Sequence, residues 1–151
     1  MSAEIAYLQD SLQQQDELLE LFEAQRRAFA ANPMPPAAQR QQWLKALQEL
    51  LNNERQALID AISQDFSNRS ADETLLAELM PSLHGIHYAS KHLKKWMKPS
   101  RRAVGLAFQP ASAKVVYQPL GVVGIIVPWN YPLYLCCLLY TSDAADDLLC
   151  V

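Results

Sequence analysis

Asn130 lies in the stretch of the chain that joins a strand-like apolar segment to residues able to do chemistry. The stretch reads Tyr117-Gln-Pro-Leu-Gly-Val-Val-Gly-Ile-Ile-Val-Pro-Trp-Asn-Tyr-Pro-Leu133. The Asn130 side-chain amide can donate two hydrogen bonds without carrying a charge. A fixed neutral donor of this kind suits a developing oxyanion.

The apolar segment before Asn130 is expected to be a buried strand. Val122 to Val127 is rich in β-branched residues, follows Gly121 and is closed by Pro128. This pattern is typical of a strand buried on both faces of a parallel sheet, and Pro128 ends it because proline has no N–H for the ladder. Since ligands of open α/β sheets bind beyond the carboxyl ends of strands, Asn130 is expected beside a binding crevice.

The motif from Gln118 to Leu133 resembles the entrance to the cofactor domain of the NAD(P)-dependent aldehyde dehydrogenases. Its Pro-Trp-Asn-Tyr-Pro sequence after a Pro-Leu-Gly-Val strand is far more restrictive than a lone glycine motif. Tyr131 and the short N-terminal region are most similar to the coniferyl-aldehyde and fatty-aldehyde branch. The resemblance covers roughly residues 39–135, and residues 1–38 are compatible with it.

The resemblance implies roles for individual residues. Asn130 would be the oxyanion-stabilising asparagine, and Ile126, Val127, Pro128 and Trp129 would line the nicotinamide cofactor, NAD or NADP. The parent enzyme would oxidise an aldehyde to a carboxylic acid through a thiohemiacetal and an acyl-enzyme. The implied fold is α/β: the N-terminal part of a Rossmann-like cofactor domain, mostly helical before its first strands. A packed core aromatic is the alternative interpretation of Trp129.

Composition limits the function classes. The chain has 151 residues, a formal net charge of −3 and dispersed Lys and Arg, which argues against a nucleic-acid surface. It contains four glycines, whereas a complete doubly wound nucleotide domain needs glycines in its phosphate loop and helix-packing turns. The glycine-dependent part is therefore expected to be missing. The first residues lack the basic and apolar regions of a secretory signal, so a cytoplasmic location is expected.

Helices are expected to fill residues 1–102 before any strand. Apolar residues at three- and four-residue steps predict a first helix from about Ala3 to Ala31, which ends before Asn32-Pro33. This helix is expected to lie across its own domain or a neighbouring subunit. A helical interaction module that uses the same stripe to bind a partner is the alternative.

Three further helical segments follow the prolines at 33–36. Two have apolar stripes within residues 43–51 and 58–66. Ser70 to Glu73 has the spacing of a capping box for a last helix that reaches about Met97, and Pro81 is expected to kink that helix.

Histidines and lysines on the last helix are expected to be structural or solvated. His84, His87 and His92 have no reliable carboxylate or cysteine to complete a ligand set, so no metal is predicted. The basic residues of the segment 91–102 complement a helix C-terminus. Phosphate or membrane binding is the alternative for that basic run.

Residues 103–120 are expected to form a strand arm. Apolar residues at 104–108 and 114–117 predict two short strands joined by a turn at 109–112. In the family that the chain resembles, such an arm joins an oligomerisation sheet, and an exposed strand edge needs a partner. A homodimer of the full-length protein is therefore expected.

A membrane tail anchor is the alternative from another class of protein. No charged residue lies between Lys114 and Asp143, which makes the segment look like a span. Pro119, Pro128 and Pro132 argue against it, because they would repeatedly break backbone hydrogen bonding in hydrocarbon.

The buried strand and its loop are assigned to residues 121–135, and residues 136–151 are expected to be a non-native tail. Residues 137–147 resemble one reading frame of a transposase mosaic-end adapter used to prepare sequencing libraries. Cys136, Cys137 and Cys150 have no basic neighbour to lower the thiol pKa, and the family's nucleophilic cysteine lies far downstream. We therefore expect unreactive thiols and no activity from this chain alone.

Overall fold

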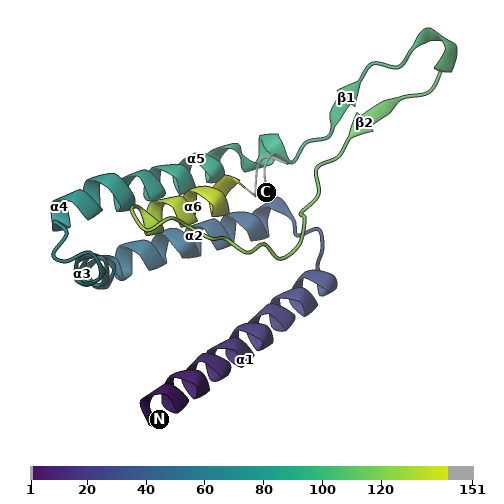
Figure 1. The fold of residues 1–151 in the computed structure, drawn as a ribbon. Coiled ribbons are helices and arrows are strands. Elements are labelled where there is room, and N and C mark those ends of the chain that lie inside the picture. Colours follow the sequence, from purple (N-terminus) through teal and green to yellow (C-terminus); the bar gives the residue numbers. More distant parts are fainter. Residues whose placement is uncertain (1, 143–151) are drawn as a thin grey trace. The chain divides into compact units, whose positions relative to one another are not determined.

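The computed structural model describes the backbone of residues 2–142 and the side chains of residues 13–138 (Figure 1). It divides into two compact units, one made of residues 2–34 and 120–124 and the other of residues 35–119 and 125–142. The elements in chain order are α1 (Ser2–Ala31), α2 (Ala37–Asn53), α3 (Arg55–Asp65), α4 (Ala71–Thr74), the π-helical turn η1 (Leu75–Leu79), α5 (Met80–Trp96), β1 (Ser100–Arg102), the 3-10 turn η2 (Leu106–Phe108), β2 (Ala113–Val115) and α6 (Pro132–Ser142).

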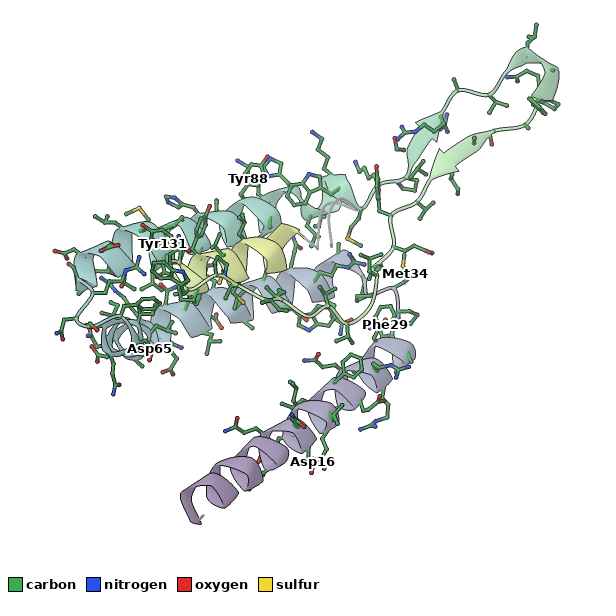
Figure 2. The ribbon with its side chains drawn as sticks, in the orientation of Figure 1. Asp16, Phe29, Met34, Asp65, Tyr88 and Tyr131 are labelled. Atoms are coloured by element: carbon green, nitrogen blue, oxygen red, sulfur yellow. The ribbon has the colours of Figure 1, made fainter. Side chains whose placement is uncertain are left out.

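The first unit is the long helix α1 with a short extended segment. The predicted first helix is confirmed, and it ends at Ala31 next to Asn32-Pro33, because the residue before a proline disfavours the helical conformation. Side chains project all around α1 between Asp16 and Phe29 (Figure 2). Gly121 has a φ of +127°, a backbone angle that residues with a side chain rarely adopt. A Cβ there would lie 3.7 Å from the Phe29 ring.

The second unit has its core between helices. α5 packs against both α2 and α6, and α2 also contacts α3 (Figure 1). Leu44, Leu51, Ile59 and Ile62 of the predicted apolar stripes are buried, whereas Trp43 and Leu50 of the same stripes are exposed. The core residues are Leu44, Leu51, Ile59, Leu79, Ile86, Ala89, Leu93 and Cys137.

The link from α3 to α4 is a tight helix end that positions Arg69. Ser67 and Asn68 have positive φ, 55° and 73°, and the Asn68 N–H donates to the Ser63 carbonyl over 2.8 Å. This 6→1 bond closes α3 in the manner of a Schellman motif. The chain then reverses, and Arg69 is carried next to the start of α4.

The predicted helix start at Ser70 is confirmed, but the capping box is wrong. Ser70 is the N-cap of α4 and its side chain makes no capping hydrogen bond. Glu73, the other half of the predicted box, instead forms an ion pair with Arg69, 3.1 Å from Nη2 to Oε1. A nearby arginine thus takes the carboxylate that the box would have used.

The irregularity expected at Pro81 occurs one turn earlier. Residues 75–79 form a π-helical turn in which the Met80 N–H donates to the Leu75 carbonyl. Pro81 has no N–H to continue a regular ladder, and a π turn is a recognised way to depart from it. Glu78 lies on this turn and is fully buried.

The predicted hairpin arm is present with different strand bounds. β1 and β2 pair antiparallel, with Arg101 opposite Lys114. The first strand therefore lies before residues 104–108, where the structure has the turn η2 instead. Leu106 in that turn is 91% exposed.

The structure differs from the sequence prediction at Val122–Val127. These residues form no strand, and Ile126 is 96% exposed. A parallel strand needs neighbours and two covering layers, whereas the only sheet within residues 2–142 is the β1–β2 pair. The mostly helical content fits the predicted N-terminal part of an α/β domain. Among the described helices, none is long and apolar enough to cross a membrane.

Candidate functional site

The segment from Pro128 to Tyr131 is a loop that leads into α6. Pro132 is the first residue of that helix, a position where its fixed φ and missing N–H are tolerated. The first N–H groups of a helix have no partner within the helix and must find one elsewhere. The partner here comes from a distant element.

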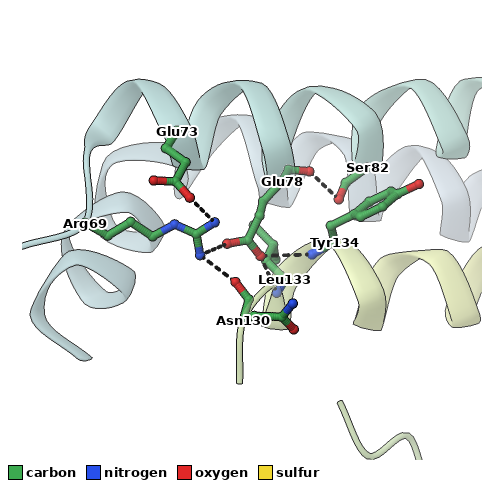
Figure 3. A network of polar contacts seen from close by, with 7 residues as sticks. All are labelled: Arg69, Glu73, Glu78, Ser82, Asn130, Leu133 and Tyr134. Atoms are coloured by element: carbon green, nitrogen blue, oxygen red, sulfur yellow. Dashed lines mark hydrogen bonds and ion pairs between the residues drawn. The ribbon is translucent and has the colours of Figure 1, made fainter. Parts of the chain in front are cut away.

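Glu78 supplies that partner. Its Oε2 accepts hydrogen bonds from the backbone N–H groups of Leu133, at 2.8 Å, and Tyr134, at 3.2 Å (Figure 3). A carboxylate at a helix N-terminus also interacts favourably with the helix dipole. Glu78 therefore caps α6 from the π-helical turn, as an N-cap side chain normally does from within the chain.

Arg69 ties the same carboxylate to the loop. Its Nη1 donates to Glu78 Oε1 over 2.9 Å and to the backbone carbonyl of Asn130 over 2.8 Å (Figure 3). Its Nη2 forms the ion pair with Glu73, without hydrogen-bond geometry. One guanidinium thus bridges the loop, the π turn and α4.

Two aromatic rings, one from the loop and one from the end of α3, lie against this guanidinium. The Arg69 Cζ atom lies 4.7 Å from the centroid of the Tyr131 ring and 5.8 Å from that of Phe66. Phe66 in turn lies 6.3 Å from the Trp129 ring, centroid to centroid. Cation–π contacts of this kind stabilise a cation that has lost its water, so Trp129 and Tyr131 both contact the region that positions Arg69.

Burial makes the Arg69–Glu78 pair mutually dependent. The Glu78 side chain is 0% exposed and that of Arg69 is 7% exposed. A buried ion loses its hydration, so removing either partner leaves the other charge uncompensated. The Glu78 carboxylate receives three hydrogen bonds, one from Arg69 and two from α6, which is how a buried carboxylate is made tolerable.

The predicted site residues lie on the outside of this network. The Asn130 side chain is exposed, and only its backbone carbonyl belongs to the contacts drawn in Figure 3. Trp129 is 78% exposed, so the core-aromatic interpretation is wrong for the described chain. Pro128 is exposed, and Val127 is half-buried. Ile126 is exposed in the segment that precedes the loop, so Ile126 and Trp129, two of the residues predicted to line the cofactor, present exposed apolar surface.

Sequence reasoning missed Arg69 and Glu78. The available signal was the position of Glu78 on the apolar stripe of its helix, beside Leu79 and two turns from Ile86. A charged residue on a buried face needs a partner of opposite charge. That partner could have been sought among the nearby arginines.

The aromatic and histidine side chains of α5 form a separate stack. Tyr88 and His92 rings are 4.0 Å apart, and His92 and Trp96 rings are 5.6 Å apart, centroid to centroid. His92 Nδ1 lies 2.8 Å from the Tyr88 carbonyl oxygen. In the part of the chain that the structure describes, no group of three or more His, Cys, Asp or Glu residues could hold a metal ion.

The described cysteines differ in environment. Cys136 is exposed and Cys137 is buried, whereas Cys150 lies outside the described residues. Burial raises the pKa of the Cys137 thiol, and a hydrogen bond with Ser82 only partly opposes that effect. Because the thiolate is the nucleophile, Cys137 is poorly suited to attack a carbonyl near neutral pH. Of the predicted non-native tail, residues 136–151, residues 136–142 are in α6, and residues 143–151 lie outside the described chain.

Alkylation should separate these two thiols. With iodoacetamide at pH 7.5, Cys136 should react at least about tenfold faster than Cys137, because burial hinders access and lowers the thiolate fraction. Peptide mass spectrometry at timed intervals measures both rates. In urea the two should react at similar rates, which controls for sequence context. Equal rates in the folded protein would contradict the buried placement of Cys137.

Known proteins are similar to most of this chain. The family model described as "Aldehyde dehydrogenase family" matches residues 3–142. A probable coniferyl aldehyde dehydrogenase of Pseudomonas aeruginosa is 73% identical over 135 residues, which cover 89% of this chain and 28% of that protein. A coniferyl aldehyde dehydrogenase of a Pseudomonas species is 44% identical over 91 residues, covering 60% and 18% of the two chains.

A third relative is a probable coniferyl aldehyde dehydrogenase of Caulobacter vibrioides, 36% identical over 119 residues that cover 77% of this chain and 24% of that protein. The three alignments thus span between 18% and 28% of the relatives' own length. The similarity is confined to a minor part of each relative.

Proposed function

Because the chain belongs to the aldehyde dehydrogenase family, we propose that it forms the N-terminal part of an oxidoreductase that converts an aldehyde to a carboxylic acid with NAD or NADP. Its similarity to relatives several times as long supports placing it within a larger enzyme. The attacking cysteine would come from outside residues 1–151. The aldehyde carbon would pass through a thiohemiacetal and then an acyl-enzyme on that cysteine.

The observation that carries this proposal is that the backbone of Asn130 is held in place while its side chain is exposed. Its backbone carbonyl is tied to Arg69 over 2.8 Å, while its side-chain amide is exposed. A neutral donor on a fixed backbone can hydrogen-bond a developing oxyanion without reorganising when the charge appears. In the proposed role, the Asn130 amide donates to the former aldehyde oxygen in the thiohemiacetal.

The residues before Asn130 fit one wall of a cofactor site. The segment around Val127 belongs to no helix or strand of the described chain. Ile126 and Trp129 present exposed apolar surface beside it. The nicotinamide cofactor would supply a hydride acceptor. With four glycines in the sequence, a phosphate-binding turn has to come from the rest of the enzyme.

Coniferyl aldehyde is the substrate that we propose to test first, because the relatives from the two Pseudomonas sources and from Caulobacter carry that name. An aromatic aldehyde also suits a site bordered by exposed aromatic and apolar side chains. A straight-chain aldehyde is the natural comparison, since it lacks the ring but has the same reacting group.

We also propose that the full-length protein is a cytoplasmic homodimer that uses the hairpin arm. Leu106 and Phe108 in its turn are 91% and 70% exposed, and exposed apolar residues favour a partner. Size-exclusion chromatography with light scattering tests the dimer.

The test of function is an assay of the full-length enzyme, read from the genomic frame that continues residues 1–135. NADH or NADPH formation should be measured at 340 nm with coniferyl aldehyde and with a straight-chain aldehyde. Product analysis should detect the corresponding carboxylic acid. Absence of aldehyde-dependent reduction of either cofactor by a folded, full-length preparation would overturn the proposed function.

A further inference from the structure

We propose that Arg69 and Glu78 are positioning residues that fix Asn130 for oxyanion stabilisation. The proposal rests on the proposed function of the site. It concerns two side chains that lie far from Asn130 in the sequence, at separations of 61 residues for Arg69 to Asn130 and 55 for Glu78 to Leu133.

The two contacts hold the chain on either side of Tyr131 and Pro132. Arg69 binds the carbonyl of Asn130 itself, and Glu78 binds the N–H of Leu133, the start of α6. The two residues between these fixed points have few backbone conformations left. Pro132 reduces that freedom further, because its φ is fixed.

We call these two contacts, Arg69 with the Asn130 carbonyl and Glu78 with the Leu133 N–H, the clamp. The clamp makes no contact with the Asn130 side-chain amide. Arg69 takes the backbone carbonyl of Asn130, so the side-chain amide keeps both donors. Tyr131 and Trp129 contact Arg69 and Phe66 through their rings rather than through Asn130. The arrangement therefore fixes direction while the amide stays exposed.

An arginine suits this task better than a lysine. The guanidinium reaches Glu78, Glu73 and the Asn130 carbonyl at once, at 2.9, 3.1 and 2.8 Å. Its donors form a planar fork, whereas an ammonium is a compact point charge with a different geometry. Lysine at position 69 keeps the charge that Glu78 needs but cannot place all three contacts.

Arg69 binds the loop, whereas the buried Glu78 lies next to Leu79 of the apolar core cluster. Arg69→Lys keeps the positive charge that the buried Glu78 needs. Loss of the clamp should therefore affect the orientation of Asn130 more than the packing of the unit. A displacement of about 1 Å in a catalytic group can cost about 10²-fold in rate.

The experiment compares Arg69→Lys with Arg40→Lys in the full-length enzyme. Arg40 is a matched control, because its Nε donates to the backbone carbonyl of Pro35 over 3.1 Å in a partly buried setting away from the loop. Arg69→Lys should lower kcat by about 10- to 100-fold and change the aldehyde KM by less than about threefold. Arg40→Lys should leave both constants near those of the unchanged enzyme.

A double-mutant cycle with Asn130→Ala distinguishes positioning from a merely structural role. If Arg69 acts through Asn130, Arg69→Lys should lower kcat by less than about twofold when Asn130 is already alanine. Independent effects would multiply in the double variant. Multiplying effects, or a normal kcat for Arg69→Lys, overturn the proposal.

Glu78→Gln provides a second variant should Arg69→Lys not fold, as judged by circular dichroism. Glutamine keeps an acceptor for the α6 N–H groups but removes the charge that holds Arg69. It should show the same kcat loss and the same non-additivity with Asn130→Ala, and a normal kcat or additive effects would overturn the proposal. An inactive unchanged enzyme would instead refute the proposed function, so the two failures are distinguishable.

Discussion

Replacing Asn130 with alanine in the full-length enzyme should lower kcat by about 10²–10³-fold, the usual cost of losing one oxyanion donor. The change removes the exposed amide but keeps the backbone carbonyl that Arg69 binds. Loop position and helix capping should therefore survive. The aldehyde KM should change little, because the lost hydrogen bond strengthens only as charge develops on oxygen. Initial-rate kinetics with coniferyl aldehyde measure both constants.

Asn52→Ala is the matched control for this substitution. Asn52 is also exposed, and its Nδ2 donates to the Gln48 carbonyl within α2 over 2.9 Å. Its replacement removes the same side chain from a helix end that contributes nothing to the loop, so kcat should stay near normal. A near-normal kcat for Asn130→Ala would refute the oxyanion assignment, even in an active aldehyde dehydrogenase.

Local patterns in the sequence predicted the helices of residues 2–96 well, but not α6. The boundary at Asn32-Pro33 depends on proline sterics, and α1 ends where the sequence indicates, at Ala31. The hairpin arm was also predictable as a pair of strands, although β1 begins at Ser100, earlier than the apolar pattern suggested. The end of α1 is decided by neighbouring residues, whereas the hairpin pairs residues from the two sides of a turn.

The clamp could not be predicted in this way. Arg69 and Glu78 are nine residues apart, and the groups that they bind lie in a later segment of the chain. Only the fold brings the π turn beside the start of α6 (Figure 3). Local charge spacing even suggested the wrong partner, since Glu73 was assigned to a capping box with Ser70 and pairs with Arg69 instead.

At Val122–Val127 the local sequence predicted an element that the structure lacks. Its apolar, β-branched sequence is typical of a buried parallel strand, yet it belongs to no sheet here. Whether a segment forms a strand depends on the neighbouring strands as well as on its own residues, because its hydrogen bonds are made between strands. In the proposed full-length enzyme, later strands would complete the sheet beside this segment.

A polypeptide of residues 1–151 by itself should show no aldehyde oxidation above buffer controls. An oxyanion donor assists only when an attacking group lies about 3–3.5 Å from the bound carbonyl. Cys137 is 5% exposed and burial raises the pKa of its thiol, so the thiolate that must attack is scarce near neutral pH. Cys136 is exposed but has no basic neighbour in the sequence to activate it.

The measurement combines turnover with the size distribution of the same preparation. Purified residues 1–151 should give no NADH or NADPH formation with aromatic or aliphatic aldehydes. They should also tend to associate, because Ile126, Trp129 and Leu106 are 96%, 78% and 91% exposed and exposed apolar surface promotes aggregation. Cys136→Ser is the control for unexpected activity. Turnover in a monodisperse sample that disappears in Cys136→Ser would show that this chain supplies its own nucleophile, contrary to the downstream cysteine that the proposed mechanism requires.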